Sequence, residues 1–429
     1  MMVNDALHDR FETYLDELAP RLGHADRVQG FQNYCRGLML PLERKSIEPI
    51  AASVDPNNVQ ACHQSLHHLV ARSGWSDREM LCGVAQQVLP YLLPPDTTPF
   101  WIIDDTGIRK KGQHSVGVSR QYCGEIGKQD NCQVAVSLSV ATEQASLPVA
   151  WRLYLPTSWT EDPARCRRAG VPEEIEFATK PEIALQQVRE TLEAGITPGI
   201  VLADAAYGKV TPWREQLAEW GLSYCVDVPE GISVWPPGSE PLPPQWSGQG
   251  RPPTRWQQTT EHHPVSAQTL AESLDANDYQ DITWREGTNK PLCSQFAAVR
   301  VRVARGQQKR EPEWLLIEWP QSDAVPAKYW LSNLPEDTSL TTLVATAKGR
   351  WRIERDYQEL KQEFGLKHYE GRNWRGFHHH ATLCTVAYGF LVMERLRCGD
   401  QKKIRPCQAV AVPEGDWSRG HKTRTTPRG

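Results

Sequence analysis

Three acidic positions in this chain have the side chains and the spacing to hold metal ions. Asp104 and Asp105 directly follow the apolar run FWII, and Asp204 directly follows the apolar run IVLA. In a sheet covered by helices, the carboxyl ends of the strands open toward the side where ligands bind. We therefore expect these aspartates to converge if their strands are neighbours. The third position is Glu354, within the stretch RWRIERDYQELKQEFG.

The stretch around Glu354 has the spacing of a helix. Arg350, Glu354 and Lys361 are spaced i, i+4, i+11 and form one stripe. A second, apolar stripe lies beside it and consists of Ile353, Tyr357, Leu360 and Phe364. A helix packed on a sheet by its apolar stripe would place a carboxylate between two cations at the edge of the interface, where a phosphate can also be held.

Three carboxylates from distant parts of a chain predict a hard, oxygen-only site. That chemistry suits Mg²⁺ or Mn²⁺ and not zinc. Two such ions about 4 Å apart activate a water and stabilise the leaving oxygen in phosphodiester cleavage. The alternatives are structural: an aspartate at a strand end is also a turn former or helix N-cap, and an Arg-Glu-Lys stripe is also a solvated helix face.

Composition limits the class of protein. The chain has 429 residues, of which 39% are hydrophobic and 23% charged, and this predicts two or three globular domains. No apolar run is long enough to cross a membrane, and the acidic N-terminus lacks the pattern of a signal peptide, so we expect a cytoplasmic protein. The 11 cysteines include no C-x-x-C pair, which disfavours a zinc ribbon. The net charge of −4 requires that any nucleic-acid contact come from local patches.

The hydrophobic pattern predicts an α/β fold with a mixed sheet flanked by helices. Residues 1–95 are expected to be helical, including a helix over 77–89 capped by Ser76. The expected strands cover residues 100–103, 134–140, 149–155, 199–203, 222–228, 298–303 and 314–319. The expected later helices cover residues 180–194, 211–220 and 340–364. Residues 230–265, rich in Pro, Gly and Trp, break this rhythm.

Three strings in this order carry a resemblance to a known family: IIDDTGIRKKGQHSVGVSRQYCGEIGKQDNCQVAVSL, ADAAYG and GRWRIERDYQELKQEFGLKHYEGRNWRGFHHH. They resemble the DDE transposases of bacterial insertion sequences, of the insertion sequence 701 type, which is related to the branch with a Tyr-Arg-Glu-Lys signature. The resemblance implies a ribonuclease H-like catalytic core. In such a core the first Asp lies on the first strand, the second after the fourth strand, and the Glu on a late helix.

The resemblance implies a catalytic and metal-binding triad of Asp105, Asp204 and Glu354. Asp104 is the alternative to Asp105, because adjacent residues of a strand point to opposite faces. Arg350 and Lys361 match the Arg and Lys of the signature and would hold DNA phosphates. The Tyr of the signature falls at Ala347, where this sequence departs from the pattern, and Tyr357 is a possible substitute.

The resemblance also suggests a division of the chain. We expect a helical DNA-binding region over residues 1–95 and a ribonuclease H-like core over residues 96–229 and 336–398. A strand-rich insertion is expected over residues 230–335, before the last catalytic helix, and a partly disordered tail over residues 399–429.

The predicted function is transposition with two Mg²⁺ or Mn²⁺ ions: cleavage at the ends of the element, then transfer of the 3′-hydroxyl into target DNA. The partners would be the terminal inverted repeats and the target duplex, with self-association on DNA, association with the nucleoid and no membrane. Two alternatives remain. One is a stand-alone metal-dependent nuclease, and the other is a domesticated DNA-binding protein that no longer cuts.

Further candidates come from local charge and aromatic residues. Lys110 and Lys111 follow the first aspartates, and Arg300 and Arg302 alternate on a strand pattern, so both pairs are predicted to contact DNA; solvation is the alternative. His378–His380 are consecutive on a helix and diverge by about 100° each, so they are not expected to chelate a metal together. Trp235 and Trp256 are candidates for stacking on an unpaired base.

Overall fold

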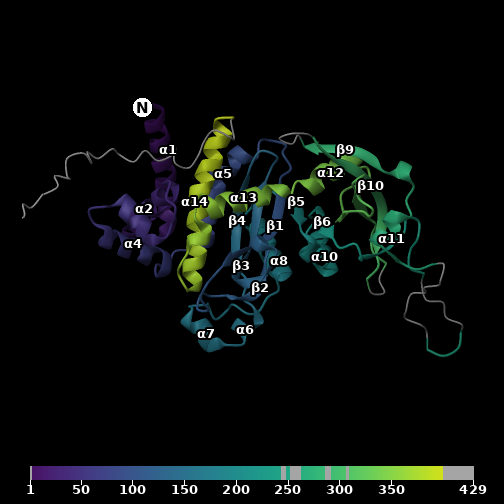
Figure 1. The fold of residues 1–429 in the computed structure, drawn as a ribbon, viewed down its shortest axis with the longest axis horizontal. Helices are drawn as coiled ribbons and strands as arrows, with labels where there is room; N and C mark the ends of the chain where they lie inside the picture. Colours follow the sequence, from purple (N-terminus) through teal and green to yellow (C-terminus); the bar gives the residue numbers. More distant parts are fainter. Residues whose placement is uncertain (1, 243–247, 252–261, 286–290, 306–308, 400–429) are drawn as a thin grey trace, which may run out of the picture.

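The computed structural model describes residues 2–242, 248–251, 262–285, 291–305 and 309–399. The predictions for Trp256 and for the tail beyond residue 399 lie outside the described residues. The prediction of an α/β fold with a mixed sheet and flanking helices is confirmed: the described residues form a sheet of 12 strands with helices packed on it (Figure 1).

The first part of the chain is helical. It contains α1 (Met2–Leu18), α2 (Val28–Met39), α3 (Ile47–Val54), α4 (Val59–Ala71) and α5 (Asp77–Leu92). The Ser76 hydroxyl accepts a hydrogen bond from the Glu79 N–H, which confirms the predicted N-cap of α5. α1, α2, α4 and α5 pack against α14 (Trp374–Arg397), a helix buried along most of its length, and α3 packs on α2 and α4 (Figure 1).

The strands before residue 230 form one half of the sheet. They are β1 (Phe100–Arg109), β2 (Ser119–Cys123), β3 (Lys128–Ala141), β4 (Ser146–Leu153), β5 (Ile200–Ala203) and β6 (Tyr224–Val228). β1, β5 and β6 are parallel neighbours, whereas β3 pairs antiparallel with β1 on its other side. β2 and β4 both pair with β3.

Helices connect these strands. Short α6 (Thr157–Thr160) and α7 (Pro163–Arg168) precede α8 (Lys180–Glu193), and α9 (Ala205–Gly208) and α10 (Thr211–Glu219) link β5 to β6. The predicted helix behind Thr179 is confirmed. Thr179 and Glu182 form a capping box at its N-terminus, where each side chain accepts a hydrogen bond from the other residue's backbone N–H.

The strands after residue 230 continue the same sheet. They are β7 (Ser233–Trp235), β8 (Val265–Ser266), β9 (Gln280–Arg285), β10 (Leu292–Val303), β11 (Glu313–Trp319) and β12 (Lys328–Ser332), with α11 (Ala267–Glu272) beside them. β12 pairs antiparallel with β6 and so joins this half to the first. Trp235 is buried against His262, which leaves no open ring face for the predicted stacking on a base.

Several predicted elements differ from the structure in their bounds, since β3 and β10 each begin six residues before the expected strand. The single helix expected over residues 340–364 is two helices, α12 (Leu340–Lys348) and α13 (Trp351–Gln362), separated at Gly349. A Cβ on Gly349 would lie 3.0 Å from a ring carbon of Phe100 and 3.2 Å from a methyl of Leu202, so the chain passes here closely over the sheet. The strand expected to end at residue 103 continues to Arg109, because its pairing with β3 extends beyond its pairing with β5.

Candidate active site

Three aspartates form one row across the parallel strands. The pairing register of β1 and β5 ends at Ile103 opposite Ala203, and that of β5 and β6 ends at Ala203 opposite Val226. The next residue of each strand is therefore Asp104, Asp204 and Asp227. Residues in register on neighbouring strands point to the same face of a sheet. The row extends into β3, where Ser137 lies opposite Asp104.

Arg350 lies over this row. It precedes α13, and its Nη1 donates a hydrogen bond of 3.0 Å to Oδ2 of Asp104. Burial lowers the pKa of Arg350, but facing carboxylates outweigh this and raise the pKa above its usual value. Those carboxylates belong to Asp104, Asp227, Asp204 and Glu354. One guanidinium thus faces four carboxylates and offsets only part of their charge.

The row concentrates negative charge in a partly buried place. Burial raises the pKa of Asp104 to about 7; Arg350 opposes this shift, while the charges of Asp204 and Asp105 add to it. Burial also raises the pKa of Asp227, with Arg350 acting in the opposite direction. Oxygen ligands with this excess of negative charge match a hard dication in chemistry.

The side chains of the two adjacent aspartates of β1 point to opposite faces of the sheet. Asp104 faces Arg350, whereas Oδ2 of Asp105 lies 2.9 Å from Nζ of Lys180, the first residue of α8. α8 packs on β3 and β4, while α13 packs on β1 and β4 with Arg350 toward Asp104. The structure therefore brings Asp104, the alternative weighed from the sequence, into the row with Asp204.

Asp204 also has the structural role that strand-end aspartates often have. Its Oδ1 accepts a hydrogen bond of 2.8 Å from the N–H of Ala206 and caps α9. Gly208 ends that helix against β6, where a Cβ would overlap the carbonyl oxygen of Asp227. The close packing of α9 on β6 fixes Asp204 beside Asp227.

Glu354 and Tyr357 occupy α13 next to Arg350. Glu354 is exposed, near enough to Arg350 to raise the pKa of the guanidinium. Tyr357 is buried, and its hydroxyl lies 2.7 Å from the Ser137 hydroxyl. This contact fastens α13 to β3 and directs the tyrosine into the sheet, away from solvent.

The described residues include no group of three His, Cys, Asp or Glu side chains arranged to hold a metal ion. The row supplies suitable ligands, but their oxygens do not converge on one point.

Most of the cations predicted to contact DNA already have partners. Lys361 donates from Nζ to the carbonyl of Gly107 at 3.0 Å, and Lys110 donates to the carbonyl of Tyr369. Burial lowers the pKa of Lys110 to about 8. Lys111 is exposed. Lys110 thus contacts the segment before α14 and no aspartate of the row.

Arg300 and Arg302 contact the chain that links β10 to β11. Arg300 donates from Nη2 to the carbonyl of Pro312 at 2.6 Å, and Arg302 donates to the carbonyl of Arg310. Both arginines serve this connection and are not part of the row.

The three consecutive histidines point in different directions, as the sequence predicted. Nε2 of His378 accepts from the Leu153 N–H at 3.2 Å. His379 contacts the carbonyls of Val70 and Trp75, each at 3.0 Å. His380 contacts the Tyr34 hydroxyl at 2.8 Å and the Gly365 carbonyl at 3.0 Å. Each histidine joins α14 to another part of the molecule.

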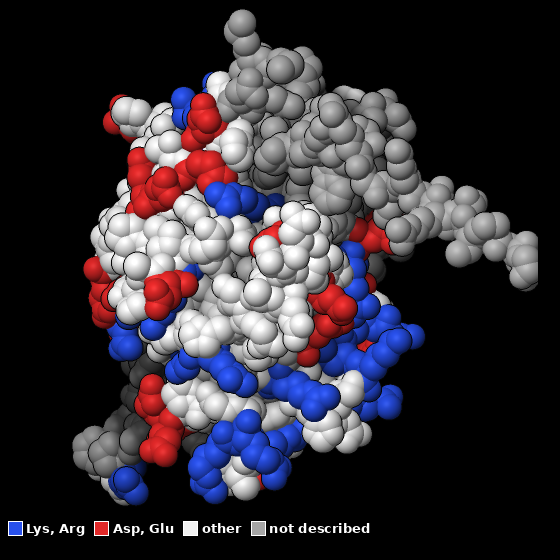
Figure 2. Space-filling view, turned by 90° about the vertical axis from the view of Figure 1, so that its left-hand side faces the viewer, with Lys and Arg blue, Asp and Glu red and all other residues white. Residues whose placement is uncertain are grey.

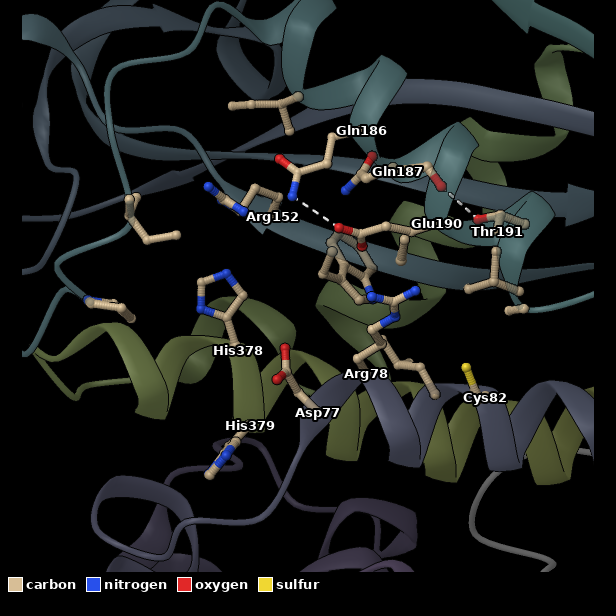
Figure 3. Close-up of a pocket in the computed structure, with 18 of the residues that line it drawn as sticks. Asp77, Arg78, Cys82, Arg152, Gln186, Gln187, Glu190, Thr191, His378 and His379 are labelled. Atoms are coloured by element: carbon tan, nitrogen blue, oxygen red, sulfur yellow. Dashed lines mark hydrogen bonds between the residues drawn. The ribbon is translucent and has the colours of Figure 1, made fainter. Parts of the chain in front are cut away.

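A cavity of about 330 Å³ lies among α5, β4, α8 and α14. Figure 3 shows Asp77 and His378 directed into it and His379 directed away. Its charged lining is mixed, with Arg78 and Arg152 beside Glu190. None of the row's aspartates lines this cavity, so it is separate from the candidate site.

The model of the DDE superfamily endonuclease family matches residues 17–291 of this chain. The chain belongs to this family. The matched range includes the three aspartates of the row and ends before α13. The resemblance to insertion sequence 701 transposases is confirmed by a relative from Microchaete diplosiphon, the probable transposase for insertion sequence element IS701, which is 32% identical over 193 residues.

That match covers 45% of this chain and 46% of the relative, so the chain spans about half the length of the curated relative it matches. Among solved structures, the piggyBac transposase synaptic complex with hairpin DNA is similar at a TM-score of 0.42 and 9% identity. That alignment covers 95% of this chain and 78% of the other. No helix in the described part of this family member is long and apolar enough to cross a membrane.

Sequence reasoning missed Asp227. It lies near the end of a predicted strand, as Asp204 does, and the parallel order of β5 and β6 makes the two equivalent. The signal was an acidic residue at the carboxyl end of a third apolar strand.

Proposed function

We propose that this DDE-family protein is an insertion-sequence transposase that cuts DNA at the row of Asp104 and Asp204, completed by Glu354. The observation that carries the proposal is the shared register of the aspartates beneath Arg350 and Glu354. Membership of an endonuclease family supports the same chemistry. The arrangement of β3, β1, β5 and β6 is consistent with the ribonuclease H-like core that the motifs imply.

The proposed cofactor is a pair of Mg²⁺ or Mn²⁺ ions held by Asp104, Asp204 and Glu354. Such ions, when bound, supply an activated water and stabilise the leaving oxygen of the scissile phosphodiester. Closing the site requires Glu354 to approach the row, and its exposed position on the first turn of α13 leaves it room to do so. Asp105 remains with Lys180 and supports the opposite face of β1.

Arg350 has two successive roles in this proposal. Without DNA it pairs with Asp104 and offsets the charge of the row. With DNA its planar guanidinium binds a backbone phosphate next to the cut, because this group fits phosphate oxygens in pairs. Asp227 would hold Arg350 at the edge of the row if Asp104 served as a metal ligand. Asp227 is thus a positioning residue.

The proposed reaction has two steps at one site. Water cleaves the phosphodiester at the element's end and frees a 3′-hydroxyl. That hydroxyl then attacks a phosphodiester of the target duplex, so one phosphodiester bond forms as another breaks. Because two ends must be joined to one target, we propose self-association on DNA.

The test is a cleavage assay on a labelled duplex that carries the DNA flanking this gene. The protein is incubated with Mg²⁺ or Mn²⁺, with EDTA in parallel, and beside the Glu354→Ala and Asp204→Ala variants. Metal-dependent nicking at the element's boundary, absent in both variants, is expected. Cleavage retained in Asp204→Ala would show that Asp204 is not part of the cleavage site. A second assay with a pre-cut 3′-hydroxyl end separates a transposase, which joins the end to target DNA, from a nuclease.

A further inference from the structure

Three segments far apart in the sequence form one basic surface. They are residues 110–118 after β1, residues 163–169 around α7, and residues 365–375 before and at the start of α14. Together they contain eight lysines and arginines and one acidic residue, whereas the whole chain has a net charge of −4. We call this the 110/165/370 surface.

Hydrogen bonds join the three segments. Arg165 donates from Nη2 to the carbonyl of Gln113 at 3.0 Å. The Val116 N–H donates to the carbonyl of Arg372 at 3.0 Å, and the Trp374 N–H donates to the carbonyl of Ala169 at 2.8 Å. Because backbone groups make most of these contacts, the relative positions of the segments are fixed and their long cationic side chains remain available.

Most of the cations on this surface are exposed. Lys110 and Arg165 bind carbonyls of the neighbouring segments and are partly buried. The exposed ones are Lys111, Arg167, Arg168, Lys367, Arg372 and Arg375. The one acidic residue, Glu370, is paired with Arg44, which lies outside the three segments. Figure 2 shows lysines and arginines gathered over the lower part of this face of the molecule, the level at which Figure 1 places α7.

β1 connects this surface to the candidate site. Lys110 directly follows β1 and is six positions after Asp104, a separation of about 20 Å in extended chain at roughly 3.3 Å per residue. Duplex DNA rises about 3.4 Å per base pair, so this separation corresponds to about six base pairs. A duplex cut at the row and lying along β1 would place its phosphates over the 110/165/370 surface.

We infer that the 110/165/370 surface binds the phosphate backbone of duplex DNA about six base pairs from the cleaved bond. This inference rests on the proposed function and adds to it the direction in which the DNA leaves the site. Arginine and lysine side chains on a fixed scaffold bind phosphates without reading sequence, so the surface contributes affinity and position. It also explains how a chain of negative net charge binds a polyanion.

The test compares two triple variants with matched charge loss. In the first, Arg167, Arg168 and Arg372 on the surface are replaced by alanine. In the control, three cations elsewhere are replaced by alanine, namely Arg189, Arg305 and Lys309, all exposed. Affinity for the labelled flanking duplex is measured over a range of salt concentrations, and backbone protection is mapped by hydroxyl-radical footprinting.

Each lost phosphate contact lowers the slope of log affinity against log salt by about 0.9, so the surface variant should lose about 3 in slope. Its affinity at low salt should fall at least tenfold, with loss of protection about six base pairs from the cut. The control should bind like the wild type.

Unchanged slope and footprint in the surface variant, with wild-type protein that binds and cuts, would overturn the inference. Wild-type protein that neither binds nor cuts would instead overturn the proposed function. If the surface variant lost the same slope on duplex RNA, and the wild type gave no footprint on DNA over this surface, DNA would not be the partner.

Discussion

Arg350 and Asp104 are 246 residues apart in the chain and are joined by a hydrogen bond of 3.0 Å from Nη1 to Oδ2. Their side chains are 21% and 15% exposed, so the pair is largely shielded from water. This contact fixes the start of α13 over the carboxylate row and defines which of the two adjacent aspartates of β1 belongs to it.

The shielded pair predicts a measurable coupling between Arg350 and Asp104. Arg350→Ala leaves a buried carboxylate without its cation, and Asp104→Ala leaves a cation without its nearest carboxylate, so each change should destabilise the fold. The double variant should lose less than the sum of the two, with a coupling of about 1–3 kcal/mol. Urea unfolding of the four proteins measures it. Strict additivity would show that the ion pair does not stabilise the protein.

Asp227 is predicted to act through Arg350. Asp227→Asn should slow single-turnover cleavage about tenfold, because Arg350 loses a negative partner at the edge of the row, while Mn²⁺ affinity stays within about twofold. Asp227→Glu, which keeps the charge, should recover part of the rate. The matched control is Asp281→Asn, an exposed aspartate on β9. A large loss of Mn²⁺ affinity in Asp227→Asn would make Asp227 a ligand and contradict the positioning role.

Gly208 is predicted to be required for the position of Asp204. In Gly208→Ala the new methyl would overlap the Asp227 carbonyl, so α9 must move away from β6. Overpacking of this kind costs about 1–3 kcal/mol. Cleavage should fall together with stability, because Asp204 caps α9 and would move with that helix. Gly231→Ala serves as the control, since a Cβ there meets no atom within 4 Å. Equal stability of the two variants in urea would contradict the packing argument.

His380 predicts a loss of stability in acid. Burial lowers its pKa to about 4, below the value of about 6.5 expected in the unfolded chain. The unfolded chain therefore binds more protons below about pH 6.5, and stability is lost as the pH falls from there toward about 4. Glutamine at position 380 does not take up this proton. The difference in free energy of unfolding between the wild type and His380→Gln should therefore shrink by up to about 3 kcal/mol between about pH 7 and about pH 4. Parallel stability curves for the two proteins would contradict this prediction.

The sequence was sufficient for local features whose causes are local. The caps at Ser76 and Thr179 lie next to their helices, and apolar runs of strand length located β5 and β6. These short-range signals also placed Asp204 at a strand end.

The remaining features depend on contacts between distant residues. The choice between Asp104 and Asp105 is set by the register of β1 with β5. The break at Gly349 comes from its packing on Phe100 and Leu202. A count of charges cannot show that a cation such as Lys361 already binds a backbone carbonyl.

The most direct test of the central claim compares Asp104→Asn with Asp105→Asn in metal-dependent cleavage of the flanking duplex. The two substitutions remove the same charge from adjacent residues of one strand that face opposite sides of the sheet. We predict that Asp104→Asn lowers cleavage by more than about a hundredfold, because replacing even a residue that only supports a metal ligand lowers metal affinity or activity by about 10–100-fold. Asp105→Asn should keep most of the activity, with some loss of stability from the contact to Lys180. Full cleavage by Asp104→Asn together with loss of cleavage by Asp105→Asn would contradict the account.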